Sequence, residues 1–384
     1  MTLSRVAMVG AVVAGVVVGA PLAAAQPVPV EPALPPLPVQ IPPVPQPVLP
    51  PIPGAAPSTT AAPTTTATPS TPAVAVAPAT SVAVAPATSA ATTTTSAAST
   101  TVAPAAACTS WKVSTVADGF GVLENLAFDG RGAMLLSESP AFGDGAIRTL
   151  TPAGTKGTLV SDVASPGGIT VRGGRVLFTT GDNVMAGLYN GTNGTVESVG
   201  LDGGDRTTVA RGLTMPNGLA ALPDGDLLVT QALGDRPGLT RIPATDPSEP
   251  ERVRTDIGSA NGLFVSPDGS TVYVGNTFDK STELRALDAA NLTGDVTTVT
   301  LPGPGPANAG DDLTVGSDGS VYMALNGAGK VVRVDPATGN TCEIATGLPL
   351  TSSVRFGAGA GWDPASLYTT GFDGSVHRLT PPAS

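Results

Sequence analysis

Residues 261–274 read NGLFVSPDGSTVYV, and this pattern of a strand, a tight turn and a second strand occurs four times in the chain. The other copies are ENLAFDGRGAMLL at 124–136, NGLAALPDGDLLV at 217–229 and DDLTVGSDGSVYM at 311–323. Asp-Gly between two β-type runs is a hairpin signal, because glycine accepts the positive φ that tight hairpin turns need. The repeated unit is therefore predicted to be a β-hairpin.

The hairpins recur at the spacing of propeller blades. Aligned on their turn glycines, the repeats begin near Glu124, Pro166, Asn217, Asn261, Asp311 and Ser353. The intervals of 42, 51, 44, 50 and 42 residues match four-stranded blades, so we predict an all-β, six-bladed β-propeller. A count of repeats alone leaves five or seven blades open. Six such units are too many for one β-sandwich and too long for the coils of a β-helix.

The two ends of the repeat region complement each other. The last repeat supplies only three strands, whereas CTSWKVSTV at 108–116 precedes the first one. Pairing these segments would close the ring and remove its exposed edges. It would also bring Cys108 onto an outer strand beside Cys342, and in an oxidising compartment we expect these two cysteines to form a disulfide.

The first 107 residues differ sharply from the rest. They carry two charged side chains, Arg5 and Glu31, so the net charge of −11 belongs to residues 108–384. Residues 1–25 combine a basic start, an apolar run and a small-residue end (AAA), which predicts a secretory signal peptide. An uncleaved membrane anchor is the alternative, because the uncharged run is just long enough to span a bilayer.

Residues 26–107 are proline-rich at first and then rich in Thr, Ala, Ser and Pro, with VAVAPATS at 74–81 and again at 82–89. Such composition has too few bulky apolar side chains to form a core, and it resembles O-glycosylated stalks. We predict a signal peptide (1–25), a disordered linker (26–107) and a propeller (108–384). The protein is accordingly expected to be exported, either secreted or held at the cell envelope.

The charge of the folded region bears on its partners. An acidic domain repels phosphate backbones and anionic lipid surfaces. We therefore expect no nucleic-acid partner and no membrane contact beyond the signal segment, and we expect a monomer.

Four oxygen-bearing residues occupy one position of the repeat, eight residues before the turn glycine: Glu124, Asn217, Asn261 and Asp311. In a propeller the innermost strands surround a central channel, so equal register means equal position around it. Their oxygens plus water suit Ca²⁺, which takes about six to eight oxygen ligands in irregular geometry. Mg²⁺, Mn²⁺ and Zn²⁺ are the other divalent candidates, and softer metals are disfavoured without nearby Cys or His. Turn capping through side-chain-to-backbone bonds is the competing interpretation.

These stretches also resemble a known family. MPNGLAALPDGDLLVT, ANGLFVSPDGSTVYVGNT, GDDLTVGSDGSVYMA and the terminal SSVRFGAGAGWDPASLYTTGFDGSV resemble the senescence marker protein/gluconolactonase/luciferin-regenerating enzyme family of six-bladed propellers, over roughly residues 113–380. The resemblance implies a divalent cation held by Glu124, Asn261 and Asp311. It implies that Asn217 ligates the cation or acts nearby, and that Asp311 helps to deprotonate an attacking water.

Two departures from the family concern the substrate. Family members often place an arginine before the third-repeat asparagine to grip a sugar-like substrate, where this chain has Met215 and Pro216. They also often follow the first glutamate with a small residue and proline, where this chain has Asn125 and Leu126. The resemblance therefore implies a metal-dependent hydrolase of a lactone or related ester, without fixing a sugar lactone as the substrate.

Other functions stay open at this stage. The main alternative is a non-catalytic binding propeller that holds a structural cation and displays a ligand or protein site at the cell envelope. A metal-free propeller of the strictosidine-synthase type is less consistent with the four oxygen-bearing residues. Paraoxonase-like chemistry needs a histidine pair, whereas the only histidine is His377, which we predict to be structural.

Overall fold

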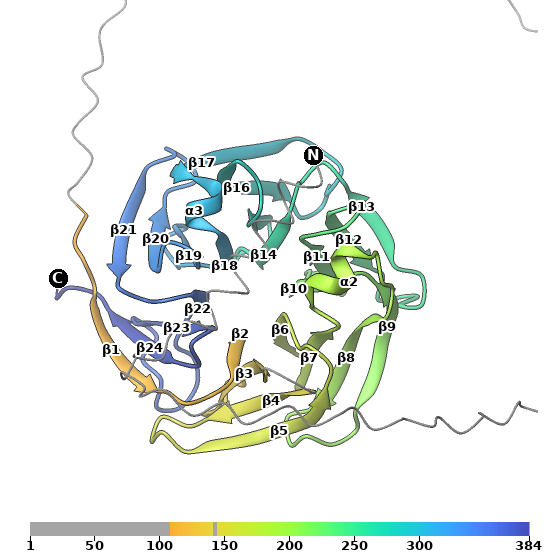
Figure 1. Ribbon diagram of the computed structural model, residues 1–384, viewed down its shortest axis with the longest axis horizontal. Helices are drawn as coiled ribbons and strands as arrows, with labels where there is room; N and C mark the ends of the chain where they lie inside the picture. Colours follow the sequence, from red (N-terminus) through yellow and green to blue (C-terminus); the bar gives the residue numbers. More distant parts are fainter. Residues whose placement is uncertain (1–107, 141–143, 384) are drawn as a thin grey trace, which may run out of the picture. The chain divides into compact units, whose positions relative to one another are not determined.

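The computed structural model describes residues 108–140 and 144–383, so the predicted signal peptide and linker lie outside the described residues. Within these ranges the chain forms six four-stranded antiparallel sheets around a central axis (Figure 1). The predicted all-β, six-bladed propeller is confirmed. No helix in the described part of the chain is long and apolar enough to cross a membrane.

The first three blades follow the chain from the innermost strand outward. Blade 1 consists of β2 (Val122–Phe128), β3 (Met134–Ser139), β4 (Gly145–Leu150) and β5 (Lys156–Val163). Blade 2 consists of β6 (Ile169–Arg172), β7 (Arg175–Thr180), β8 (Gly194–Gly200) and β9 (Thr207–Leu213). Blade 3 consists of β10 (Pro216–Ala221), β11 (Leu227–Gln231), β12 (Gly238–Ile242) and β13 (Glu251–Arg254).

The next two blades repeat this order, and the sixth uses both ends of the domain. Blade 4 consists of β14 (Ala260–Val265), β15 (Thr271–Asn276), β16 (Ser281–Asp288) and β17 (Val296–Pro304). Blade 5 consists of β18 (Gly310–Val315), β19 (Val321–Leu325), β20 (Lys330–Val334) and β21 (Thr341–Thr346). Blade 6 consists of β22 (Thr351–Phe356), β23 (Leu367–Gly371), β24 (Val376–Thr380) and β1 (Lys112–Ala117).

The ring closes as the sequence predicted. Strand β1 pairs antiparallel with β24, from Lys112 opposite Thr380 to Ala117 opposite Val376. The disulfide Cys108–Cys342 joins the segment before β1 to β21 of blade 5, with the two Cα atoms 5.4 Å apart. The N-terminal segment is therefore fixed to two neighbouring blades at once.

The apolar core is a ring of interfaces between blades. Six clusters of buried side chains each draw from two neighbouring sheets, as Phe178 of blade 2 and Leu135 of blade 1 do. This arrangement follows from the strand pattern, since both faces of a blade are covered by neighbours. Because apolar side chains fill these interfaces, the channel is left for polar groups.

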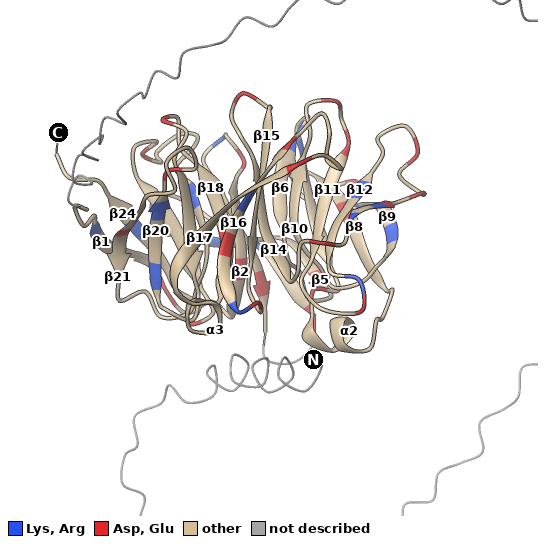
Figure 2. Ribbon diagram, turned by 90° about the horizontal axis from the view of Figure 1, so that it is seen from above, with Lys and Arg blue, Asp and Glu red and all other residues tan. Residues whose placement is uncertain are grey.

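The innermost strands run in one direction along the channel. Two short helices, α2 (Val184–Leu188) and α3 (Gly305–Asn308), lie on the face where these strands begin, and the hairpin turns that follow the strands lie on the opposite face (Figure 2). The channel therefore has two distinct mouths. We call the one at the strand starts the entry mouth and the one at the strand ends the exit mouth.

Candidate functional site

The four residues predicted to surround the channel lie where strand pairing is interrupted. We call them the ring residues: Glu124, Asn217, Asn261 and Asp311. In five innermost strands the register with the second strand shifts close to the first residues, for example between Ala260 and Leu263 in β14. A bulge of this kind releases backbone groups from the ladder and redirects side chains. The start of each of these strands is therefore free to make contacts across blades.

Threonines from neighbouring blades use these released carbonyls. Three threonines at or just after the ends of second strands each donate a hydrogen bond to the innermost strand of the next blade. The pairs are Thr179 with the carbonyl of Asn217 (3.1 Å), Thr230 with that of Asn261, and Thr277 with that of Gly310 (2.6 Å). Each bond fixes the backbone at or directly before one of the predicted site residues to the preceding blade.

The glycines after Asn217 and Asn261 are needed for this close approach. A Cβ atom on Gly218 would lie 2.6 Å from the carbonyl oxygen of Asn261, and one on Gly262 would lie 2.4 Å from the Cα of Asp312. Neither distance can be tolerated without movement of the backbone. The Asn-Gly pairs thus combine a side chain that points into the channel with a residue that lets two blades touch.

Asn217 connects two carboxylates at the entry mouth. Its Nδ2 donates to Glu124 Oε1 at 3.0 Å and to Asp182 Oδ2 at 2.9 Å. Asp182, in the loop between β7 and α2, was not predicted from the sequence. Its Oδ1 is buried and makes no hydrogen bond with any residue that the structure describes. The amide of Asn217 therefore orients both the predicted Glu124 and the unpredicted Asp182. Oδ1 of Asp182 stays available as a ligand.

Asn261 and Asp311 are oriented in a similar way by residues after second strands. Asn261 Nδ2 donates to Thr277 Oγ1 at 2.8 Å, and its buried Oδ1 makes no hydrogen bond within the described ranges. Asp311 Oδ2 accepts from Asn326 Nδ2 at 3.3 Å. Both Asn261 and Asp311 are buried. The amide oxygen of Asn261 is thus a second oxygen without a hydrogen-bond donor.

The carboxylates of the entry mouth destabilise one another's charge. Burial raises the pKa of Glu124 from 4.5 to about 7, and the charge of Asp312 adds to this effect. Burial and then Glu124 raise the pKa of Asp182 well above its usual range. Burial, Glu124, Asp312 and Asp182 do the same to the pKa of Asp311. The ionised form of each of these carboxylates is therefore disfavoured by burial and by its acidic neighbours.

The donor set fits a hard divalent cation. Glu124, Asp182, Asn217, Asn261 and Asp311 offer oxygen atoms only, and buried oxygens on two of them lack hydrogen-bond donors. In the described ranges no three His, Cys, Asp or Glu side chains form a group that could hold a metal ion. The ring predicted from the sequence likewise combines carboxylate and amide oxygens.

A second layer lies directly beneath this ring. The buried Oδ2 of Asp312 accepts from Asn125 Nδ2 at 2.9 Å and from Ser353 Oγ at 2.6 Å, and it pairs with Arg355 Nη1 at 2.7 Å. Asp312 occupies the position of the glycine in the Asn-Gly repeats. Sequence reasoning treated the Asp-Asp pair as one ring residue and therefore missed this layer.

Blades 2 and 6 differ from the prediction by one residue. Pairing of Ile169 with Phe178 and of Val354 with Thr369 places Gly167 and Ser352, instead of Pro166 and Ser353, in the register of the ring. A Cβ on Gly167 would lie 2.7 Å from Asp182 Oδ2. Blade 2 therefore contributes Asp182 to the site from the loop between β7 and α2. The glycine at position 167 leaves room for this carboxylate.

His377 lies away from the channel. It is on β24, the third strand of blade 6, where its ring contacts Thr115 and Ser375 and burial lowers its pKa. The prediction that this histidine has a structural role is consistent with these contacts.

Comparisons with known proteins agree with the architecture. A gluconolactonase from Xanthomonas campestris superposes with a TM-score of 0.56 at 18% identity, over 73% of this chain and 99% of that one. A protein proposed to be a gluconolactonase gives 0.54 at 19% identity, over 70% and 92%. A luciferin-regenerating enzyme gives 0.53 at 15% identity, over 71% and 95%. At these identities the likeness shows the shared fold.

The sequence itself gives the more specific result. No curated protein matches it. Residues 144–371 match the family model for the SMP-30/gluconolactonase/LRE-like region. The matched residues include Asn217, Asn261 and Asp311, whereas Glu124 precedes them. The matched region spans more than half of the chain and follows the propeller from blade 1 to blade 6. The chain therefore belongs to the SMP-30/gluconolactonase/LRE-like family.

Proposed function

We propose that the protein is an exported, metal-dependent hydrolase of a lactone or related ester, with its active site at the entry mouth. The observation that carries the proposal is the set of three carboxylates with raised pKa values, Glu124, Asp182 and Asp311, beside the amide oxygen of Asn261, which has no hydrogen-bond donor among the described residues. A bound cation would stabilise the ionised form of these carboxylates. Family membership supports hydrolysis of a lactone as the reaction.

The residues divide into ligands and a base. Glu124, Asp182 and Asn261 would hold the cation, and Asn217 keeps two of these carboxylates in place through its amide hydrogens. Calcium is the expected ion because the donors are carboxylate and amide oxygens. When bound, the cation would supply positive charge for the carbonyl oxygen of the substrate as negative charge develops there.

Asp311 is the proposed general base. Asn326 fixes its orientation through Oδ2, and its raised pKa makes it a better proton acceptor than an ordinary aspartate. Asp311 takes a proton from water while the water oxygen adds to the acyl carbon. The ring C–O bond then breaks, and the proton passes from Asp311 to the leaving alkoxide. The product is a hydroxy acid, and the enzyme is regenerated.

Hydrolysis of a panel of five- and six-membered lactones tests this proposal. The purified protein is stripped of metal with a chelator, assayed, and assayed again after calcium is supplied. We expect hydrolysis to vanish and to return. A folded protein that binds calcium but hydrolyses none of the panel would contradict the proposal and favour the binding propeller instead.

A further inference from the structure

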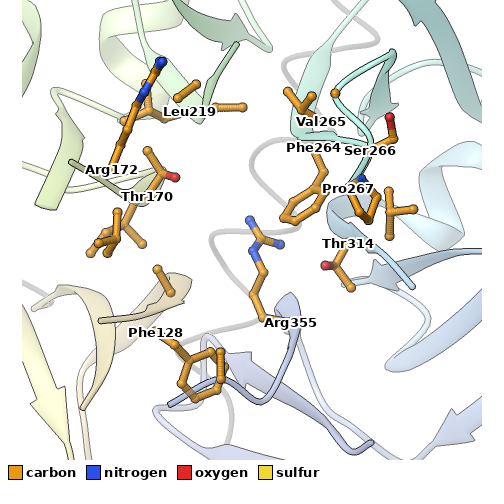
Figure 3. A pocket seen from close by; sticks show the side chains of 18 of the residues that line it. Phe128, Thr170, Arg172, Leu219, Phe264, Val265, Ser266, Pro267, Thr314 and Arg355 are labelled. Atoms are coloured by element: carbon orange, nitrogen blue, oxygen red, sulfur yellow. The ribbon is translucent and has the colours of Figure 1, made fainter. Parts of the chain in front are cut away.

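The exit mouth holds a cavity of about 660 Å³. Its walls are the last residues of the innermost strands and the turns after them, including Phe128, Thr170, Phe264 and Arg355 (Figure 3). The ring residues lie at the starts of these strands, so the cavity is at the opposite end of the channel from the proposed active site. Its size suits a ligand of drug-like dimensions.

The charged side chains in the wall of this cavity are arginines. Arg172 and Arg355 line it, and none of the described residues around it is Asp, Glu, Lys or His. The chain as a whole carries a net charge of −11. Asp312 pairs with Nη1 of Arg355 from below the cavity, and the donors that Arg355 presents to the cavity favour a ligand with an acidic group.

Arg355 lies in the middle of the cavity with a fixed orientation. Its guanidinium is 5.1 Å from the centre of the Phe264 ring, and the side chain is 11% exposed. The hydrogen bonds to the carbonyls of Leu313 and Val354 and the ion pair with Asp312 all use Nη1. The planar fork formed by Nε and Nη2 is left for a carboxylate, the group it fits best.

Arg172 lies on the opposite wall, above Thr170 (Figure 3). Its guanidinium points away from Arg355 toward the turn of blade 3 (Figure 3), where a Cβ on Gly225 would lie 3.9 Å from Nη2. Arg355 is therefore the charged group at the centre of the cavity.

The rest of the wall is largely apolar. Phe128, Phe264, Leu219 and Val265 surround the guanidinium groups. Aromatic and branched side chains bind the hydrophobic body of a ligand, whereas the charged groups fix its polar end. We propose that the exit mouth binds a small organic acid, with its carboxylate on Arg355 and its apolar or aromatic body against Phe128 and Phe264.

Fluorescent probes test this site on the full chain. The probes are 8-anilinonaphthalene-1-sulfonate and N-phenyl-1-naphthylamine, which share their rings but differ in the anionic group. We expect saturable binding of one sulfonate probe per chain, with an affinity at least about tenfold above that of the neutral probe, since a charge-assisted bond contributes at least this much. We further expect 1-naphthoate, a carboxylate, to displace the sulfonate probe, and naphthalene to fail. Absence of sulfonate binding, or failure of 1-naphthoate to displace it, would overturn the proposal.

Three variants test whether the probe binds in the exit cavity. Arg355→Gln should weaken sulfonate binding about tenfold and leave the neutral probe within about twofold. Thr170→Trp should block both probes by filling the cavity without touching the Arg355–Asp312 pair, so it decides the question if Arg355→Gln does not fold. Arg333→Gln is the matched control, because Arg333 pairs with Asp318 outside this cavity. Sulfonate binding that survives Thr170→Trp, or that weakens equally in the control, would show that the probe binds elsewhere.

Discussion

The two mouths of the channel are built from the same strands but carry opposite chemistry. At the entry mouth, strand pairing is interrupted, and carboxylates gather above the Arg355–Asp312 ion pair of the layer below. At the exit mouth, pairing is regular, as in Leu219 opposite Val229 and Ala221 opposite Leu227, and the polar side chains are arginines and hydroxyls. At the entry mouth the irregular backbone helps to position the oxygen-bearing side chains. At the exit mouth the backbone is regular, and the chemistry depends on the side chains alone.

One buried ion pair joins the two ends. Asp312 is 2% exposed and belongs to the layer under the acidic ring, whereas its partner Arg355 extends into the exit cavity. Breaking such a pair leaves a buried charge uncompensated, which is strongly destabilising. The pair therefore links blade 5 to blade 6, with its carboxylate toward the entry mouth and its guanidinium in the exit cavity.

The largest expected effect separates the two mouths by activity. Asp311→Asn removes the proposed base with little change in volume, and lactone hydrolysis should fall about a thousandfold. Thr170→Trp alters only the exit mouth and should stay within about threefold of the unchanged protein. Steady-state hydrolysis rates measure both, and thermal unfolding checks the fold. Retained activity in the Asp311 variant, or equal loss in both, would place the chemistry elsewhere.

The next effect concerns stability and pH. Glu124 has its pKa raised from 4.5 to about 7 in the fold. A group with a raised pKa contributes its full stability below the unfolded pKa, and that contribution is lost as pH rises through the folded pKa. The metal-free protein should therefore be more stable at pH 5 than at pH 8, by on the order of 3 kcal/mol for Glu124 alone. Thermal unfolding in chelator at both pH values measures the difference.

Two further samples sharpen this prediction. Calcium should raise the melting temperature more at pH 8 than at pH 5, because it binds the ionised carboxylates. Glu124→Gln should flatten the pH dependence of the metal-free protein. A chelator-treated protein that is less stable at pH 5 than at pH 8 would contradict the assigned direction.

A smaller effect tests the close packing of the entry mouth. A Cβ on Gly262 would lie 2.4 Å from Asp312 Cα and 2.7 Å from the carbonyl of Asp311, so Gly262→Ala should destabilise the fold by about 2 kcal/mol. Gly191→Ala is the control, since its Cβ would meet nothing closer than 3.5 Å. Denaturant unfolding compares the two. Equal stabilities would mean that the blades can separate without loss.

The sequence predicted the fold because the repeat is local. Each hairpin turn and each short strand depends on neighbouring residues, and a constant interval between hairpins defines the blades. The same register placed Glu124, Asn217, Asn261 and Asp311 at one mouth. These residues are separated widely along the chain, yet equal position in a repeat is sufficient to bring them together.

The residues that the sequence did not reveal come from outside that register. Asp182 reaches the ring from a loop in the blade whose innermost strand has only glycine there, so no side chain marks the position. Asp312 and Arg355 meet across two blades, and their pairing depends on the depth of each side chain in the channel. The sequence does offer one local indication. The segments at the ends of two second strands, TTGDN at 179–183 and GNTFD at 275–279, are mostly polar, and they contain Asp182 and Thr277, which both contact ring residues.

The smallest effect asks whether the unpredicted Asp182 provides charge or only orientation. Asp182→Asn keeps an oxygen that can accept from the amide of Asn217, so the geometry around Glu124 should persist. It removes one negative charge from the ring, and calcium affinity should fall about tenfold in titration calorimetry of the metal-free protein. Asp202→Asn, in an exposed turn, removes the same charge far from the ring and should leave affinity unchanged. If both variants bind calcium equally well, Asp182 only positions Asn217, and its charge does not contribute to cation binding.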